Sequence, residues 1–309
     1  MTGGAGFIGS HLVERLVHLG SILAVFDKLT TGSLTNLAEI GERVHLVEAD
    51  VGQIEWHDVL VRETYDVIFH MAGTAYVPFS VERPDLDFAA NLLPTFRLLQ
   101  AIRDIKWPGA VLFPSSAAVY GNPRRMPIHE EDPTVPISPY GVSKLAAERY
   151  LAVFSQLYGI RAASVRPFSA YGPRQRKLVV YDLIQRILAD PTELFIYGDG
   201  SQVRDFIYVD DVVAALLCVA ENAPLRGEAY NVASGEGCSI GKLVTLLCEM
   251  LGVDPQLNYS GAVRQGEPER WAVSIARIAA LGYQPLVSLE EGLRPTVEWC
   301  RVALAERSS

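Results

Sequence analysis

The chain has 309 residues, of which 49% are hydrophobic and 20% charged, so it can bury a sizeable core and is expected to be globular. Its formal net charge of -9 argues against a nucleic-acid partner, because neutralising phosphates requires clustered lysine and arginine. The four cysteines are widely separated and no apolar run is long enough to span a bilayer, so we expect no metal site, no disulfide framework, no membrane partner and a cytoplasmic location.

The chain opens on a glycine-rich segment, TGGAGFIGSHL, that leads directly into an amphipathic helical pattern. Glycines at this spacing allow a tight turn and a close approach of the backbone to a pyrophosphate, which then faces the N-terminus of the helix. The residues expected to bind a dinucleotide here are Gly3, Gly6, Phe7, Ile8 and Gly9.

Only Met1 and Thr2 precede the first glycine, although this motif normally follows a strand. The first, central strand of the expected sheet is therefore largely absent from the sequence. Two interpretations remain open. The native start lies upstream of Met1, which is the interpretation we favour, or the chain is shortened where its cofactor site is built and is unstable or inactive.

Short apolar runs rich in β-branched residues alternate with helical patterns through the first half of the chain. The runs lie at residues 22–26, 44–47, 67–69, 111–113 and 162–165. This alternation predicts an α/β fold, a doubly wound parallel sheet of the Rossmann type, with ligands at the carboxyl ends of its strands.

The pattern changes after Arg166 to turns, a helical segment near 181–188 and a short strand near 194–197. We therefore expect a dinucleotide-binding domain over residues 1–165 and a smaller C-terminal substrate domain over 166–309. A further apolar run at 229–232 is expected to return to the main sheet as one more strand.

An acidic residue, Asp27, closes the run at 22–26. Its carboxylate can accept hydrogen bonds from both ribose hydroxyls of an adenosine and would repel a 2′-phosphate, so NAD is favoured over NADP. Lys28 directly after it weakens this preference.

The next two strand ends also carry candidate cofactor contacts. Asp50 and Val51 follow the run at 44–47, where Asp50 is placed to accept a bond from an adenine amino group, although an ordinary solvated acid is the alternative. HMAG follows the run at 67–69, and its small residues, Ala72 among them, allow a cofactor to pass closely. We expect His70 to be structural rather than catalytic.

Tyr140 and Lys144, in YGVSK, are spaced i, i+4 and share one face of a predicted helix. A nearby ammonium favours the phenolate, so we expect it to lower the pKa of Tyr140 and to let the phenol act as a base. Ser115 and Ser116 end the strand predicted at 111–113, and a serine hydroxyl there can bridge a substrate hydroxyl and Tyr140. Tyr140, Lys144 and one of these two serines are the predicted catalytic residues.

The chain resembles the extended short-chain dehydrogenase/reductase family, specifically its nucleotide-sugar epimerases and dehydratases. The resemblance runs nearly the whole length, through TGGAGFIGSHL, HMAG, SSAAVYG, SPYGVSK, RPFSAYGPRQ, GDGSQVRDFIYVDD and SLEEGL. It implies that Tyr140 is the base, that Lys144 is its cofactor-binding partner and that Ser116 is the strand-end hydroxyl at the site, which makes Ser116, Tyr140 and Lys144 the catalytic group. It also implies that Asn91 is a cofactor-side asparagine. It further implies NAD as cofactor and a homodimer formed through the helix that bears Tyr140.

Ala117 and Ala118 follow Ser116 where dehydratases of this family carry an Asp-Glu pair and related decarboxylases a Glu. Methyl groups cannot transfer protons, so the resemblance leaves epimerisation at C4 of a nucleotide sugar of the UDP-glucose type. The alternatives are an NAD(P)-dependent 4-ketoreductase, a dehydratase and a non-catalytic NAD-binding protein. A hydrolase using Ser116 is disfavoured, because the G-x-S-x-G elbow is missing.

The resemblance also points to residues that bind the nucleotide sugar. Arg204 and Arg264 are expected at the diphosphate, since guanidinium forks suit phosphate oxygens, and Arg174 is a weaker candidate. Ser169 stands where the family pattern has a substrate-contacting Asn. Trp271 falls where such epimerases line the 2-substituent of the sugar, and its bulk favours plain hexoses over N-acetylated ones.

Overall fold

The computed structural model describes residues 1–261 and 271–308. Its main sheet has all neighbouring strands parallel, in the orders β2-β1 and β3-β4-β5-β9, with helices on both faces, which confirms the predicted doubly wound α/β fold. The strands are Ala24–Asp27 (β1), His45–Glu48 (β2), Val67–Phe69 (β3), Ala110–Pro114 (β4), Arg161–Pro167 (β5) and Arg226–Val232 (β9).

Met1 and Thr2 join the two parts of this sheet. Thr2 forms parallel bridges with Phe26 in β1 and with His70 directly after β3. The terminal amine of Met1 donates a hydrogen bond to the carbonyl oxygen of Ala24 at 2.6 Å, and burial lowers its pKa to about 5. These two residues therefore occupy the central strand position, and the pairing continues from β1 to β3.

The strand β4 is buried on both faces, as expected for the middle of a parallel sheet. Ala110 and Leu112 belong to one apolar cluster, whereas Val111 and Phe113 belong to another on the opposite face. Alternating side chains of a strand point to opposite faces, so one short apolar run supplies both cores.

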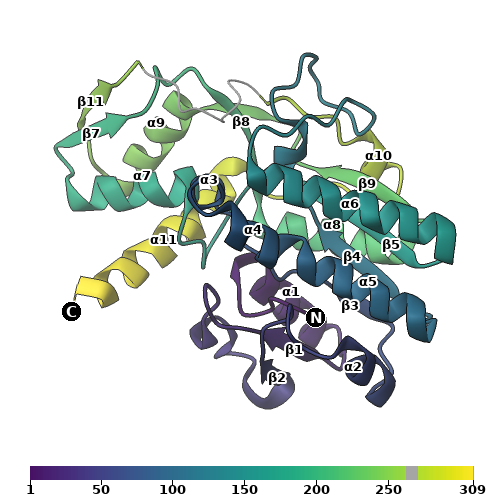
Figure 1. Ribbon diagram of the computed structural model, residues 1–309. Coiled ribbons are helices and arrows are strands. Elements are labelled where there is room, and N and C mark those ends of the chain that lie inside the picture. The colour runs from purple at the N-terminus through teal and green to yellow at the C-terminus, as the bar shows by residue number, and fades with distance from the viewer. Residues whose placement is uncertain (262–270, 309) are drawn as a thin grey trace.

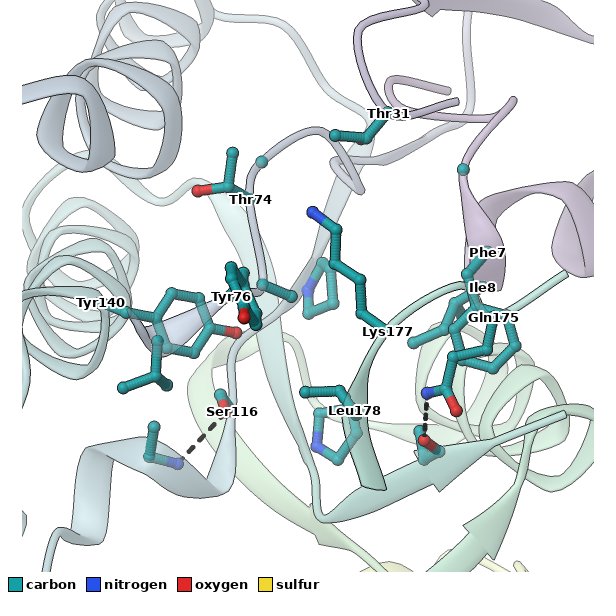
Figure 2. Close-up of a pocket in the computed structure, with 18 of the residues that line it drawn as sticks. Phe7, Ile8, Thr31, Thr74, Tyr76, Ser116, Tyr140, Gln175, Lys177 and Leu178 are labelled. Atoms are coloured by element: carbon teal, nitrogen blue, oxygen red, sulfur yellow. Dashed lines mark hydrogen bonds between the residues drawn. The ribbon is translucent and has the colours of Figure 1, made fainter. Parts of the chain in front are cut away.

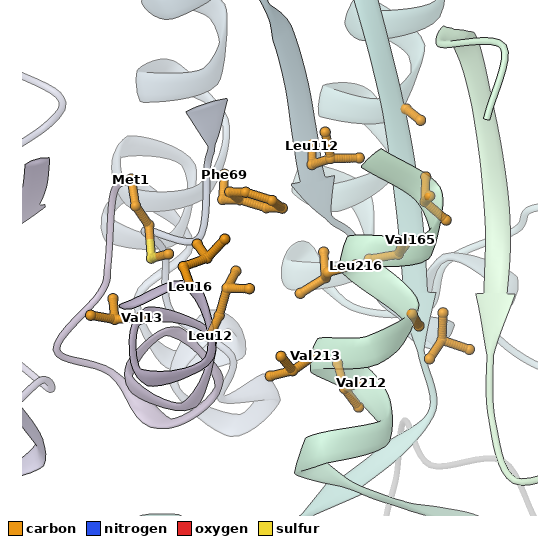
Figure 3. Close-up of a cluster of buried hydrophobic side chains, with 14 of the residues drawn as sticks. Met1, Leu12, Val13, Leu16, Phe69, Leu112, Val165, Val212, Val213 and Leu216 are labelled. Atoms are coloured by element: carbon orange, nitrogen blue, oxygen red, sulfur yellow. The ribbon is translucent and has the colours of Figure 1, made fainter. Parts of the chain in front are cut away.

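Helices cover the two faces of the main sheet. On one face lie Phe7–His18 (α1) and Val209–Asn222 (α8), and Figure 3 shows Leu12 and Leu16 of α1 facing Val213 and Leu216 of α8. The other face is covered by Trp56–Arg62 (α2), Leu93–Ile105 (α5) and Pro139–Tyr158 (α6), with Val77–Glu82 (α3) and Pro84–Asn91 (α4) against α6.

A smaller unit has its own apolar core, and Figure 1 shows its helices α7 and α9 and its strands β7 and β11 on one side of the molecule, away from β1 and β2. Its strands are Ser169–Tyr171 (β6), Glu193–Ile196 (β7), Val203–Tyr208 (β8), Gly237–Ser239 (β10) and Gln256–Tyr259 (β11). Its helices are Leu178–Ala189 (α7), Ile240–Leu251 (α9) and Leu289–Ser308 (α11). A short helix, Ala276–Ala279 (α10), contacts β9.

The chain returns from the smaller unit to the main sheet. The helix α8 packs on α1 and β5, and β9 pairs in parallel with β5. The strand expected at 229–232 lies within β9, which begins earlier, at Arg226. Residues 209–232 therefore belong spatially to the layers of the main sheet, although they follow residue 165 in the sequence.

A buried ion pair ties α6 to β5. Arg166 donates from Nε and Nη2 to the two carboxylate oxygens of Glu148, at 2.9 Å and 2.7 Å, and both side chains are 5% exposed. Arg166 Nη1 also donates to the hydroxyl of Tyr120, which donates in turn to Asn231 in β9. This network fixes the helix that carries the Tyr140 motif against the sheet.

Candidate active site

A large pocket runs along the carboxyl ends of the main-sheet strands and into the smaller unit. Figure 2 shows Tyr140 and Ser116 on one side of it and Phe7 and Ile8, at the start of α1, on the other. The predicted site residues that line it are Gly3, Gly6, Phe7, Ile8, Gly9, Asp27, Asp50, Val51, Ala72, Ser116, Tyr140, Lys144, Ser169, Arg174, Arg204 and Trp271. Arg264 lies outside the described residues.

The glycine loop is shaped by close backbone contacts. Gly3 has φ +65°, and a Cβ there would lie 2.6 Å from the amide nitrogen of Ala72; a Cβ on Gly9 would lie 2.1 Å from the carbonyl oxygen of Gly3. Within the described residues no side chain caps α1, whose N-cap is Gly6, and its first turn has no acidic residue. A helix N-terminus of this kind suits a pyrophosphate, so the loop fits a dinucleotide.

The two carboxylates at the adenosine end are held differently. Asp27 accepts hydrogen bonds from the backbone amides of Ala5 and Leu29, at 2.9 Å and 2.8 Å, which leaves acceptor capacity on both oxygens. Asp50 accepts a hydrogen bond from Lys28 Nζ at 2.7 Å, which is the main cause of the lowered pKa of its carboxyl. The ammonium of Lys28 is thus neutralised by Asp50, and the site favours NAD over a 2′-phosphorylated cofactor.

Asn91, predicted on the cofactor side, is not among the residues that line the pocket. Its side-chain oxygen accepts a hydrogen bond from the amide of Thr74 at 3.1 Å, and its nitrogen donates to Asp87 at 2.8 Å. Asn91 is buried in α4 behind the segment Gly73–Thr74, which does line the pocket. It therefore supports the wall of the cofactor channel from behind.

His70 is buried beside this segment, with Nδ1 3.0 Å from the hydroxyl of Thr2. Burial is the main cause that lowers its pKa to about 3, and the charge of Lys144 adds to the effect. These contacts give His70 a structural place, as a neutral side chain next to the central strand.

The predicted catalytic groups come from the start of α6 and the end of β4. Ser138 caps α6 by accepting a hydrogen bond from the amide of Gly141, which places Tyr140 in the first turn. Tyr140 is buried and lies on the same side of the pocket as Ser116, whose Oγ accepts a bond from the amide of Ala118 at 3.1 Å. The structure therefore brings the serine and tyrosine hydroxyls together at the pocket wall.

Lys144 lies one turn further along α6. Its Nζ donates to the carbonyl oxygen of Pro114 at 2.9 Å and lies 6.0 Å from the centroid of the Tyr140 ring. Burial lowers the pKa of Lys144 to about 8, against the opposing charges of Asp87 and Glu148.

In the absence of a cofactor the pKa of Tyr140 lies above its usual value, although Lys144 is close by. Burial raises the pKa of Tyr140 to about 12; the hydrogen bond with Ser116 offsets part of this, and the charge of Asp87 adds to it. The ammonium is directed at a backbone carbonyl, and desolvation of the phenolate outweighs its attraction. A further positive charge is needed to bring the phenol toward use near neutral pH.

The two described candidate arginines have different surroundings. Arg174 forms an ion pair with Glu14 and donates to the hydroxyl of Ser10 at 3.2 Å, so it links its loop to α1. Arg204, in β8, lies with its guanidinium carbon 5.5 Å from the ring centroid of Trp271. Arg204 and Trp271 therefore form one group at the substrate half of the pocket.

Ser169, in β6, is adjacent to that half, because β6 pairs in parallel with β8. Trp271 packs edge-on against Phe168, with ring centroids 5.3 Å apart. These contacts form a wall of the pocket in which the indole is fixed.

Lys177, Tyr76 and Gln175 are among the pocket residues that were not predicted. Lys177 Nζ lies 5.2 Å from the ring centroid of Tyr76, and Figure 2 shows its side chain extending between the two sides of the pocket. Gln175 donates to the carbonyl oxygen of Ala170 at 2.7 Å. The run of basic residues after GPRQ was the available signal, but such a run usually marks a solvated surface.

The glycine loop, Asp27 and the group of Ser116, Tyr140 and Lys144 on a doubly wound sheet define an extended short-chain dehydrogenase/reductase. The chain belongs to the NAD dependent epimerase/dehydratase family, whose family model matches residues 1–233. It is similar to a UDP-glucose 4-epimerase of Mycolicibacterium smegmatis, with 35% identity over 308 residues that cover 97% of each chain.

Two solved structures are also similar over nearly the whole chain. One is a UDP-glucose 4-epimerase of Thermotoga maritima with UDP-glucose, at TM-score 0.90 and 34% identity, covering 98% of each chain. The other is a UDP-glucose 4-epimerase of Thermus thermophilus in complex with NAD, at TM-score 0.88 and 35% identity, again covering 98% of each chain. Among the described residues no helix combines the length and apolarity of a membrane span, and no cluster of metal-ligating side chains is found.

Proposed function

We propose that the protein interconverts a nucleotide sugar of the UDP-glucose type and its C4 epimer, with NAD retained through turnover. The observation that carries this proposal is the placement of Tyr140 and Ser116 together at the wall of a pocket whose other end fits a dinucleotide. Relatives and solved neighbours that act on UDP-sugars support the substrate class.

Different residues of the chain are assigned to the two ligands, NAD and the nucleotide sugar. Residues 1–165 are assigned to NAD and 166–309 to the nucleotide sugar, with α8 and β9 completing the first unit. The contacts assigned to NAD are Gly3, Gly6, Phe7, Ile8 and Gly9 for the pyrophosphate, Asp27, Asp50 and Val51 for the adenosine, and Ala72, Tyr140 and Lys144 for the remainder. Those assigned to the nucleotide sugar are Ser116, Ser169, Arg174, Arg204, Arg264 and Trp271.

NAD held by the glycine loop and Asp27 would supply reversible hydride chemistry at C4 and, when oxidised, a positive ring charge near Tyr140. Tyr140 takes the proton of the 4-hydroxyl at its phenol oxygen, and Ser116 orients that hydroxyl. Lys144 is ammonium below its pKa of about 8 and favours the phenolate. After the 4-keto sugar presents its other face, Tyr140 returns the proton, and no net oxidation results.

The pocket wall next to Ser116 favours epimerisation over dehydration. Ala117 and Ala118 line the pocket with methyl groups, on the turn Ala117–Tyr120 that directly follows Ser116. Expelling a 6-hydroxyl requires an additional acid and base, which methyl groups do not provide. A 4-ketoreductase would consume and release its cofactor in each cycle, and a retained cofactor separates the two reactions.

Conversion without added cofactor tests the proposed function. Purified protein incubated with UDP-galactose alone is expected to form UDP-glucose, detected by chromatography, because the cofactor is regenerated within each turnover. Protein that contains bound NAD but converts neither this sugar nor other UDP-hexoses would refute the proposed reaction. Conversion only with added reduced cofactor would instead establish the reductase.

The proposal includes a homodimer and a cytoplasmic location. Helices α4 and α6 carry exposed apolar side chains at Phe88, Val142, Val153 and Leu157, which support a homodimer formed through α6. Sedimentation equilibrium decides this, and the mass of a single chain would contradict it. The four cysteines are free thiols, which supports a reducing, cytoplasmic location.

A further inference from the structure

A buried carboxylate, Asp87, lies behind the proposed catalytic pair and has no part in the steps above. It lies in α4 and is 1% exposed. One of its oxygens accepts a hydrogen bond from the hydroxyl of Ser143 at 2.7 Å, and the other accepts one from the amide nitrogen of Asn91 at 2.8 Å. Both donors are neutral, so these hydrogen bonds place the carboxylate without neutralising it.

Both hydrogen-bond partners of Asp87 are adjacent to residues that line the pocket. Ser143 precedes Lys144 in α6. Asn91 holds the amide of Thr74, and a Cβ on Gly73 would lie 2.5 Å from the Asn91 oxygen and 3.7 Å from Lys144 Nζ. Gly73 therefore lies between the side-chain amide of Asn91, which Asp87 holds, and the ammonium of Lys144.

The charge of Asp87 acts on both groups of the pair. It raises the pKa of Lys144, opposing the larger effect of burial, and it also raises the pKa of Tyr140. Through a dry interior such a charge is weakly screened.

Other charged or titratable groups face the pair from neighbouring elements. Glu148, in α6, is paired with Arg166 of β5, and His70, after β3, is kept neutral by burial. The end of β4 and the following turn contribute the uncharged serines Ser115 and Ser116. Among these described groups, Glu148 is paired with an arginine, whereas the carboxylate of Asp87 accepts hydrogen bonds from two neutral donors.

We propose that Asp87 is a positioning residue for the reaction: held between Ser143 and Asn91, its negative charge keeps Lys144 protonated at the working pH. The assignment rests on the roles proposed for Tyr140 and Lys144. Asp87 acts through these residues and through the wall at Gly73–Thr74, without touching the sugar.

Removing the negative charge of Asp87 is expected to shift two pKa values in the same direction. In Asp87→Asn the pKa of Lys144 falls, so the ammonium is lost at a lower pH, and the pKa of Tyr140 also falls, so the phenolate forms at a lower pH. Both limbs of the pH profile of kcat therefore move toward acid, by about one pH unit. A residue with only a structural role would lower kcat without moving the limbs.

The test compares kcat against pH for the NAD-loaded wild type, Asp87→Asn and Ser143→Ala. The serine variant removes a hydrogen bond to Asp87 and keeps its charge, so its limbs are expected to stay in place. Tyrosinate absorbance of cofactor-free protein, measured with and without Tyr140→Phe, gives a second readout and is expected to show the lower pKa of Tyr140 in Asp87→Asn. Asp87→Ser repeats both measurements if Asp87→Asn does not fold.

The inference would be overturned if Asp87→Asn and Asp87→Ser left both limbs of the pH profile of kcat and the titration of the Tyr140 phenol unchanged. That outcome differs from failure of the proposed function, which appears as wild-type protein that does not convert the sugar or as an active Tyr140→Phe variant. Equal shifts in Ser143→Ala would also count against the charge of Asp87, because that variant retains it.

Discussion

Replacing Tyr140 with phenylalanine is expected to lower kcat by about 10³-fold or more, because it removes the phenol oxygen that takes the proton of the 4-hydroxyl. The ring stays in its buried position in the first turn of α6, so the fold and the bound NAD are expected to remain. The measurement is kcat for UDP-galactose conversion, together with the NAD released on denaturation.

Tyr171→Phe is the matched control. Tyr171 is 1% exposed in the core of the smaller unit, and its hydroxyl donates to the carbonyl oxygen of Leu289 at 3.2 Å. This variant loses one buried tyrosine hydroxyl away from the site and should keep kcat near the wild-type value. Activity of Tyr140→Phe within tenfold of the control would remove Tyr140 from the mechanism.

The second large effect is expected from Arg166→Met, which leaves Glu148 buried without its cation. Breaking a buried pair by removing one partner costs about 3–5 kcal/mol of unfolding free energy, because the remaining charge stays desolvated. Urea unfolding measures the loss. In the double variant Arg166→Met and Glu148→Met much of the stability should return, since two apolar side chains then replace the pair.

Arg62→Met provides the comparison at the surface, because Arg62 pairs with Asp58 across one turn of α2 while both side chains are largely exposed. No measurable loss is expected there. A double variant no more stable than Arg166→Met alone would contradict this account of the ion pair, because the buried carboxylate of Glu148 would then not be the source of the loss.

The sheet could be predicted because its strands are short apolar runs between helical patterns. The run at 67–69 coincides with β3, whereas the run at 22–26 begins too early, since Ile22 is fully exposed and the strand starts at Ala24. Hydrophobicity marks where a strand lies but does not fix where its hydrogen bonding begins. For the same reason the pairing of Met1 and Thr2 with β1 and β3 could not be read from their side chains.

Most candidate site residues share one pocket, because the carboxyl ends of parallel strands meet at one edge of a sheet. The sequence could not show how deeply a side chain is buried or on which side of the pocket wall it lies. Asn91 matches a family motif yet lies behind the wall, and Asp87 resembles an ordinary acid of a first helical turn until its burial is known. The raised pKa of Tyr140 likewise results from desolvation that i, i+4 spacing does not reveal.

The central claim is that C4 is oxidised and reduced again by one retained cofactor. UDP-galactose carrying deuterium at C4 tests it directly, with purified protein in ordinary water and no added nucleotide. The UDP-glucose formed is expected to keep the deuterium at C4, seen by mass spectrometry and by the missing C4 proton signal in NMR. Loss of the label to solvent would contradict the account, because it would mean that the hydrogen leaves C4 as an exchangeable proton.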